Sequence, residues 1–259
     1  MTGVSDGFHW KDEPWGRSLR SATLAGLADH LFTTCQLRLR GGREAEEWAA
    51  VGRALGVDGG RVARLKQVHG REVVVLKGGA AILPDAASRP HADIVATDDP
   101  SLAIAVQVAD CVPLLMAGPG GRVVAAVHAG WRGTCAAAAV GGVEALEREF
   151  GARPADLVVA VGPSIGPCCY IVGGEVLEQF EAAHENAARW FRRDGDGRLR
   201  LDLWAANADQ LEDAGVPRAS IRVSRLCTAC HPGLFHSYRR DGPGTGRIAA
   251  AIRAKGCGP

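Results

Sequence analysis

The chain has 259 residues, of which 47% are hydrophobic and 23% are charged, a composition typical of a globular domain with a large buried core. Thirty basic and 29 acidic residues leave a formal net charge of +1, which argues against a nucleic-acid partner. The sequence has no run of eighteen apolar residues, so we expect no membrane partner, and its N-terminal stretch lacks the apolar core of a secretion signal. We therefore expect a cytoplasmic protein whose eight cysteines are buried thiols, metal ligands or nucleophiles rather than a disulfide framework.

Residues 1–28 show no clear periodicity, and we expect them to be a partly ordered N-terminal segment of the same domain that residues 29–259 form. The first predicted helix covers residues 43–55, where apolar side chains recur at helical spacing: Ala45, Trp48, Ala49, Val51 and Leu55. Short runs rich in valine and isoleucine, bounded by glycine, proline or aspartate, predict strands over residues 72–76, 92–97, 102–107, 122–128, 157–162 and 221–226.

Three further helices are predicted between these strands, over residues 134–150, 175–192 and 202–213, and Asp202 is the expected N-cap of the last one. The sequence Asp-Gly-Asp-Gly at residues 194–197 predicts a hairpin turn. Strands and helices interleave, and several strands are apolar on both faces, which indicates sheets covered by helices. The predicted fold class is therefore α/β (α+β mixed), a single domain of packed mixed β-sheets flanked by helices.

Three segments each carry a side chain of the metal-ligand type at the edge of an apolar run: Gln67-Val68-His69-Gly70, Ala109-Asp110-Cys111-Val112-Pro113 and Val127-His128-Ala129-Gly130-Trp131-Arg132-Gly133. A strand that ends at such a point delivers the side chain to a loop while it holds the backbone rigid. One thiolate and two imidazoles are a ligand set that zinc accepts, and a fourth position stays open for water or substrate. The spacing alone does not separate this interpretation from buried cysteines and hydrogen-bonded core histidines.

A second group of candidate ligands is Cys227-Thr228-Ala229-Cys230-His231, followed by His236. The letters C-x-x-C-H match a haem attachment site, but covalent haem requires export, which the N-terminal stretch does not indicate. A zinc site formed by Cys227, Cys230, His231 and His236 and a redox-active C-x-x-C pair both stay open. The adjacent residues Cys230 and His231 could hardly bind one tetrahedral ion without strain.

Basic residues beside glycines indicate sites for phosphate or a carboxylate. Arg132, within residues 130–133, lies at the head of the alanine-rich predicted helix, where free N–H groups favour an anion. Arg239 and Arg240 form a second such region together with residues 244–247. Solvated arginines and structural ion pairs are the alternative interpretation of both regions.

Seven motifs occur in a characteristic order, at residues 67–70, 109–113, 128–134, 162–166, 227–228, 237–242 and 245–247. In this order they closely resemble the YfiH family, whose members are also called laccase-domain proteins, multicopper polyphenol oxidases or purine nucleoside phosphorylases. The resemblance extends over residues 29–259, and the pair A-D-C-x-P and H-A-G-W-R-G is its most specific part. It implies a single α/β domain with a deep pocket, in which His69, Cys111 and His128 correspond to the family's three zinc ligands.

The resemblance also implies an activity. Members of the family cleave purine nucleosides such as adenosine, inosine and guanosine with phosphate, deaminate adenosine, and in some cases cleave methylthioadenosine. We therefore expect a zinc-dependent purine nucleoside phosphorylase with adenosine deaminase activity, whose partners are a small-molecule nucleoside and phosphate. The alternatives are a copper-dependent polyphenol oxidase, an enzyme of peptidoglycan precursor editing, and a non-enzymatic zinc scaffold. Copper is the less favoured metal, because a laccase needs a dense array of histidines and this chain has eight in all.

The expected catalytic residues are His69, Cys111 and His128, joined by Asp110 and Arg132. We expect Asp110 to orient a ligand or to carry a proton, and the phosphate to bind Arg132 with Arg239 or Arg240. The chain departs from the family pattern at Thr33-Thr34-Cys35, where a Thr-Arg pair is usual, at Ile171, where an acidic residue is usual, and at His236, where an aromatic residue is frequent. None of these departures touches the three expected ligands.

Overall fold

The computed structural model describes residues 7–78 and 88–256, and these residues form two six-stranded sheets and a small hairpin. The first sheet has the strand order β1 (Phe8–Glu13), β2 (Gly16–Ser21), β3 (Asp29–Phe32), β14 (Ile248–Arg253), β7 (Ala103–Val108) and β4 (Val62–Arg64). The second sheet has the order β13 (Ile221–Val223), β10 (Val158–Val161), β8 (Val112–Ala117), β9 (Val124–Ala129), β6 (Ile94–Thr97) and β5 (Val73–Leu76). The hairpin pairs β11 (Phe191–Arg193) with β12 (Leu199–Leu201).

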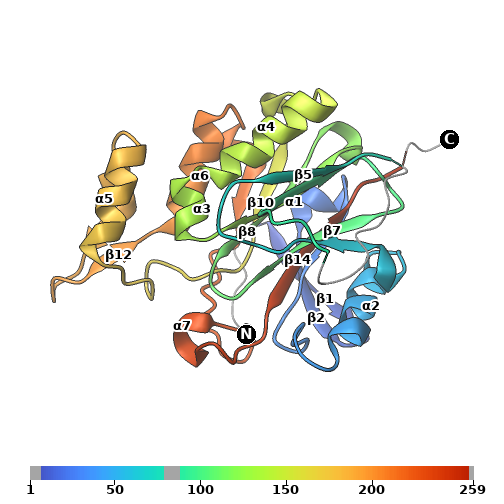
Figure 1. The fold of residues 1–259 in the computed structure, drawn as a ribbon, viewed down its shortest axis with the longest axis horizontal. Coiled ribbons are helices and arrows are strands. Elements are labelled where there is room, and N and C mark those ends of the chain that lie inside the picture. The colour runs from blue at the N-terminus through green and yellow to red at the C-terminus, as the bar shows by residue number, and fades with distance from the viewer. Residues whose placement is uncertain (1–6, 79–87, 257–259) are drawn as a thin grey trace.

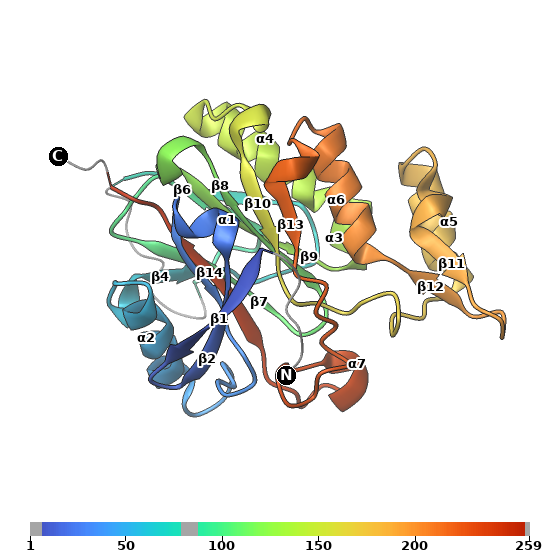
Figure 2. The same ribbon diagram turned by 180° about the vertical axis from the view of Figure 1, so that it is seen from behind.

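Seven α-helices accompany the strands in the described residues: α1 (Ala22–Ala25), α2 (Glu44–Ala54), α3 (Trp131–Cys135), α4 (Ala138–Phe150), α5 (Gly174–Ala183), α6 (Leu203–Asp213) and α7 (Tyr238–Asp241). Short 3-10 helices lie at Gly59–Arg61, Pro119–Gly121, Pro154–Asp156, Ala187–Trp190 and Arg218–Ser220. Helix α2 lies beside the first sheet, whereas α3, α4 and α6 lie together over the second (Figure 1). Helix α5 and the β11–β12 hairpin extend to one side of this body (Figure 2).

The two sheets pack face to face, and each carries helices on its outer face. Alternating side chains of one strand enter different layers, as expected for the period of two of a β-strand. In β8, Leu114 and Met116 face helices α4 and α6, whereas Leu115 and Ala117 face the first sheet. A third apolar cluster joins Trp48 of α2 to the outer face of the first sheet. Both sheets are thus apolar on both faces, and the predicted fold class is confirmed.

Most of the predicted elements are confirmed. The helix expected over 43–55 is α2, the helix expected over 202–213 is α6, and the side chain of Asp202 accepts the N–H of Ala205 as its N-cap. The six predicted strands correspond to β5, β6, β7, β9, β10 and β13, and residues 194–197 form the turn of the β11–β12 hairpin.

Two predicted helices are wrong in extent. The helix expected over 134–150 is divided into α3 and α4 by Ala137, whose φ of 59° is left-handed and cannot continue a helix. The helix expected over 175–192 ends at Ala183, after which the chain forms a 3-10 turn and strand β11. The apolar residues of this second half, among them Trp190, are buried from turn and strand positions instead.

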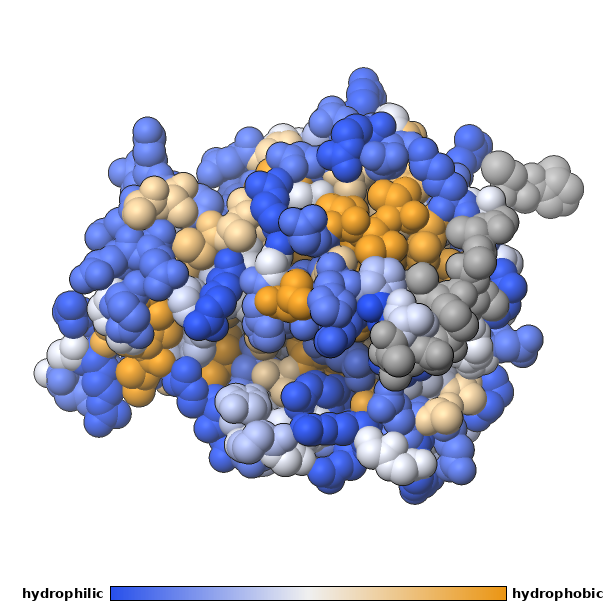
Figure 3. Space-filling view, in the orientation of Figure 1, coloured by the Kyte–Doolittle hydropathy of each residue, from blue (hydrophilic) through white to orange (hydrophobic). Residues whose placement is uncertain are grey.

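The N-terminal segment contains structure that its sequence did not predict. Strands β1, β2 and β3 form one side of the first sheet, where β3 pairs with β14. Residues 1–6 of this segment lie outside the described residues. No helix in the described part of the chain has the length and apolar character that crossing a membrane requires. The face in Figure 3 is mainly hydrophilic, with a hydrophobic patch over β5, whose first three valines are half-buried at the edge of the second sheet.

The chain passes from one sheet to the other between β7 and β8. Strand β7 belongs to the first sheet and β8 to the second, so residues 109–111 span the gap between them. The carboxyl end of β9 lies beside the start of β8, where His128 pairs with Pro113. Side chains from both sheets therefore meet at this crossing point.

Candidate metal centre and its cavity

His128 is held in one orientation by a buried carboxylate. It lies near the end of β9, and Asp93 directly precedes the neighbouring strand β6. Its backbone N–H donates to the Asp93 carbonyl at 2.8 Å, and its Nδ1 lies 2.7 Å from Asp93 Oδ1. Because an ionised carboxylate only accepts, Nδ1 carries the proton and Nε2 is directed to the other donors. This carboxylate–histidine pair is the arrangement that commonly supports a metal-binding imidazole.

Asp93 also holds the loop that carries His69. Its two oxygens accept the backbone N–H groups of residues 68, 69 and 70 at 3.2, 2.9 and 2.8 Å. His69 has a left-handed backbone with a φ of 65°, a conformation that costs a non-glycine residue about 1–2 kcal/mol. The hydrogen bonds to Asp93 offset this strain. Asp93 was not identified from the sequence, where the only signal was one acidic residue at the start of an apolar run.

Cys111 is positioned by the turn between the two sheets. The preceding residue, Asp110, has a φ of 89°, and its carboxylate oxygens accept the Thr228 hydroxyl and the Arg239 backbone N–H, each at 2.6 Å. The Asp110 carbonyl accepts the N–H of Ile165 at 2.9 Å. Asp110 therefore fastens the Cys111 turn to two other loops, and these contacts occupy both of its carboxylate oxygens.

The three expected ligands come together in the structure. One donor atom each of His69, Cys111 and His128 lies within 4.8 Å of the others, and the two imidazole rings meet edge to face at 4.9 Å between centroids. Gly130 leaves room for this approach, because a Cβ there would lie 2.9 Å from the Cys111 sulfur and 3.1 Å from His69 Cδ2. A sulfur and two nitrogens from three separate loops form the donor set of an open zinc site, so the residues fit a metal ion.

The charges at the triad favour an ionised sulfur. Burial opposes ionisation, but the charge and hydrogen bonds of His128 and the hydrogen bond of His69 lower the pKa of Cys111 to about 6. Burial likewise opposes protonation of His128, yet the neighbouring Cys111 and Asp93 raise its pKa to about 9. The thiolate that results is the form of cysteine that ligates metals.

The triad lines a cavity of about 670 Å³, a volume typical of small-molecule sites. His128 is buried, Cys111 is half-buried and His69 is exposed, so the donors are accessible from the cavity. The wall is mixed in character, with the apolar side chains of Leu65, Val108, Ile165 and Leu203, the aromatic side chains of Trp131, Tyr170 and Tyr238, and the amides of Gln67 and Gln107.

Three arginines among the described residues contribute to the cavity wall: Arg132, Arg239 and Arg247. The Arg132 guanidinium lies over the Trp131 ring at 4.2 Å, and that of Arg239 lies over Tyr170 at 5.0 Å. Such stacking holds a guanidinium while its N–H groups stay available to an anion. Arg239 also donates to the Ile171 carbonyl at 2.9 Å. The cavity thus combines a metal-ligand set with a cluster of positive charge.

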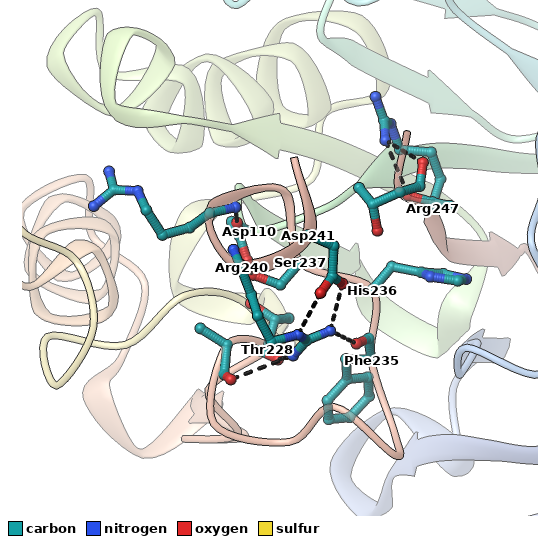
Figure 4. A network of polar contacts seen from close by, with 12 residues as sticks. Asp110, Thr228, Phe235, His236, Ser237, Arg240, Asp241 and Arg247 are labelled. Atoms are coloured by element: carbon teal, nitrogen blue, oxygen red, sulfur yellow. Dashed lines mark hydrogen bonds and ion pairs between the residues drawn. The ribbon is translucent and has the colours of Figure 1, made fainter. Parts of the chain in front are cut away.

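Arg240 has a different environment from its neighbour. Its guanidinium donates to the carbonyls of Thr228 and Phe235, each at 2.8 Å, and to the Asp241 carboxylate at 2.7 Å (Figure 4). It does not belong to the described residues that line the cavity. The geometry therefore favours a role for Arg240 in clamping the loop that follows β13 rather than in phosphate binding.

Arg247 lines the cavity although the sequence indicated it only as part of a glycine-rich basic region. Burial and the nearby charge of Arg40 lower its pKa. Tyr170 was likewise not singled out, and burial together with the charge of Cys111 raises its pKa to about 12. Arg247 ends the motif at residues 245–247, whereas Tyr170 lies in none of the seven motifs, so no sequence signal indicated its place in the cavity.

A family model, curated proteins and a solved crystal structure are all similar to this chain. Residues 43–255 match the family model described as "Multi-copper polyphenol oxidoreductase laccase". The chain is 39% identical over 192 residues to the purine nucleoside phosphorylase YlmD of Geobacillus stearothermophilus, covering 72% of this chain and 70% of that protein. It is 37% identical over 205 residues to adenosine deaminase RL5 from an unknown prokaryotic organism, covering 78% of each. The crystal structure of YlmD from G. stearothermophilus superposes with a TM-score of 0.84 at 31% identity, covering 95% of this chain and 99% of that one.

Proposed function

This chain belongs to the multi-copper polyphenol oxidoreductase laccase family, and we propose on that premise that it is a zinc-dependent purine nucleoside phosphorylase that also deaminates adenosine. One curated relative is named purine nucleoside phosphorylase and another adenosine deaminase, which supports an enzyme of this general kind. The proposed substrates are adenosine, inosine, guanosine and methylthioadenosine with phosphate. A cytoplasmic location agrees with these substrates and belongs to the same proposal.

One observation carries the proposal: the donors of His69, Cys111 and His128 share a cavity with the guanidinium groups of Arg132 and Arg239. Phosphorolysis needs two things at once, an anion site for phosphate and a group that stabilises the departing purine. A cavity of about 670 Å³ is large enough to hold a nucleoside beside phosphate. Zinc bound by the triad would supply Lewis acidity toward an atom of the purine or a water molecule.

The chain's own residues account for the remaining steps of phosphorolysis. Arg132 and Arg239 bind phosphate and orient one oxygen toward C1′ of the ribose. A bond forms between that oxygen and C1′ as the C1′–N9 bond breaks. The purine leaves with the bonding electrons and takes up the proton that the hydrogen phosphate loses. The Tyr170 hydroxyl lines the cavity and is a donor for a developing negative charge. Asp93 holds the His128 ring so that the donor set keeps its geometry throughout.

The test uses the full chain, loaded with zinc and incubated with inosine with and without inorganic phosphate. We expect release of hypoxanthine and formation of ribose 1-phosphate only when phosphate is present, and conversion of adenosine to inosine without it. Cys111→Ala should abolish both activities, whereas Cys35→Ala, a matched change at a half-buried thiol outside the triad, should retain them. Full phosphorolysis by Cys111→Ala would refute the proposed site.

The oxidase alternative makes a different demand on the histidines. A multicopper site needs several imidazoles around a group of copper ions. In the described part of the chain only His69 and His128 contribute to a candidate metal cluster, while His30, His231 and His236 bond backbone carbonyls. Oxygen consumption with a phenol by the copper-loaded protein, together with no release of base from inosine, would support the oxidase instead.

A further inference from the structure

A second cluster of soft ligands lies outside the catalytic cavity. The sulfurs of Cys168, Cys169, Cys227 and Cys230 all lie within 4.8 Å of one another. Cys230 Sγ is 3.5 Å from Cys168 Sγ and 3.4 Å from Cys169 Sγ. None of the four belongs to the cavity lining. No sequence pattern connects the two pairs, which are separated by more than fifty residues.

We propose that these four sulfurs bind a second zinc ion in a closed, structural site. A zinc ion with four thiolates at about 2.3 Å requires sulfurs about 3.8 Å apart at the corners of a tetrahedron. The observed separations of 3.4 and 3.5 Å, with every pair within 4.8 Å, need only small adjustments to reach this geometry. A set of four thiolates fills the tetrahedral coordination of zinc, which distinguishes this site from the open three-donor site in the cavity.

The backbone around Cys227 is arranged to stabilise a thiolate. The N–H of Gly166 donates to its sulfur at 3.3 Å, and the N–H of Cys230 is also directed to it.

Two loops meet at the cluster. Cys168 and Cys169 belong to the connection from β10 to α5, and Cys227 and Cys230 belong to the connection from β13 to α7; the two connections run side by side (Figure 2). An isolated bridge between Ser164 and Cys227 already joins them. Cys168 and Cys230 are exposed, so an ion can enter from the surface.

This assignment replaces the two-cysteine, two-histidine site that the sequence left open. His231 Nδ1 lies 2.8 Å from the Cys227 carbonyl oxygen, and His236 Nε2 lies 3.0 Å from the Leu37 carbonyl oxygen. Neither imidazole belongs to the group of donor atoms that cluster with Cys227 and Cys230, and Cys168 and Cys169 take their places.

The zinc ion would also support one wall of the cavity. Tyr170 directly follows Cys169, lines the cavity and carries the stacked Arg239, which in turn bonds the Ile171 carbonyl. An ion at the cluster would fix the backbone on which this wall depends. Loss of the ion should therefore weaken phosphate binding by way of Arg239, while the triad keeps its own metal.

The test counts zinc in full-length protein purified under reducing conditions, on a Cys111→Ala background that removes a triad donor. This background makes the result independent of the proposed function. We expect one tightly bound zinc per chain in Cys111→Ala, none after the further change Cys230→Ser, and one after the control change Cys35→Ser. Because Cys230 is exposed, its replacement should leave the fold intact, and Cys168→Ser provides a second variant of the same kind.

A spectroscopic measurement checks the ligands directly. Cobalt(II) added to Cys111→Ala should give strong sulfur-to-metal charge-transfer absorption. The further change Cys230→Ser should greatly reduce this absorption, and added zinc should abolish it by displacing the cobalt. Zinc content that is unchanged by both Cys230→Ser and Cys168→Ser would overturn the proposal. A reduced protein that binds no zinc although all four cluster cysteines are free thiols would also overturn the proposal. The same holds for a purified protein whose mass is lower by two hydrogen atoms because Cys230 forms a disulfide with Cys168 or Cys169.

Discussion

Replacing Asp93 by asparagine tests whether the metal centre depends on a carboxylate that contacts no substrate. The variant Asp93→Asn keeps the size of the side chain and removes its charge and one acceptor oxygen. In the native site the two oxygens accept four N–H donors, three from the backbone of residues 68–70 and one from His128 Nδ1. An asparagine oxygen can serve the two donors on one side, and the amide nitrogen then faces the other two.

The magnitude follows from these four donors. Two backbone N–H groups left without an acceptor cost about 1–2 kcal/mol each, so the free energy of unfolding of the metal-free protein should fall by about 2–4 kcal/mol. If the amide nitrogen faces His128 instead, Nδ1 must lose its proton and Nε2 must carry one, which removes Nε2 as a ligand. Loss of such a supporting carboxylate typically lowers metal affinity about 10- to 100-fold, and we expect this range for zinc at the triad.

Zinc affinity is measured by competition with a chromophoric chelator, and stability by urea unfolding of the metal-free chain. The matched control is Asp98→Asn, at the other end of β6, whose Oδ1 accepts one backbone N–H from Gly78 at 2.8 Å. The control should leave zinc affinity unchanged and should lower stability by less than about 1.5 kcal/mol. An Asp93→Asn protein that binds zinc as tightly as the wild type would refute the positioning role.

The variant Gly130→Ala should lower zinc affinity at the triad about tenfold or more, because the added Cβ would lie 2.9 Å from the Cys111 sulfur. A zinc affinity equal to that of the wild type in the chelator competition would contradict this packing argument. Burial lowers the pKa of His30 to about 4, so the folded chain excludes a proton that the unfolded chain binds below pH 6.5. The free energy of unfolding should therefore be unchanged above pH 6.5 and should fall by up to about 3 kcal/mol as the pH drops to 4. The variant His30→Gln should show a flatter pH dependence in urea unfolding. An equally steep pH dependence in this variant would exclude His30 as its source. Arg132→Ala should raise the KM for phosphate roughly 10- to 100-fold, with a smaller effect on the KM for inosine. The control Arg153→Ala, which removes the ion pair with Asp156, should leave both KM values unchanged. A phosphate KM equal to that of the wild type in Arg132→Ala would show that Arg132 does not bind the anion.

The fold could be predicted where a local pattern decides the structure. Helix α6 was found from its N-cap and apolar spacing, and the central strands from their valine-rich runs. Strand β8 is not among the predicted strands although it is fully buried, because Pro113 at its second position weakens the local strand signal. The break at Ala137 has no local signal, since alanine is a helix former and its left-handed backbone is imposed by the packing of α3 and α4.

The three metal-ligand candidates could be predicted from the sequence, but the residues that position them could not. The motifs identified the family, which the comparisons confirm, and the resemblance selected His69, Cys111 and His128 from the many plausible ligands. Asp93 could not be selected, because its role depends on the pairing of β6 with β9. The partnership of the two cysteine pairs also arises from tertiary structure, in which separate loops converge.

The left-handed backbones of His69 and Asp110 indicate which part of the cavity is held rigid. Each conformation carries strain of about 1–2 kcal/mol, and each is stabilised by hydrogen bonds from other loops: Asp93 accepts the N–H of His69, and the Asp110 carboxylate accepts donors from Thr228 and α7. These bonds fix the backbone at two of the three donor loops, so the donor set is preorganised and should tolerate little change in the ion it binds. The stacked guanidinium groups of Arg132 and Arg239 are on exposed residues and rest on aromatic faces, which leaves them more able to adjust than the metal ligands. Differences in nucleoside preference among related chains should therefore arise from substitutions on the arginine and tyrosine wall, and a change of metal from substitutions around Asp93.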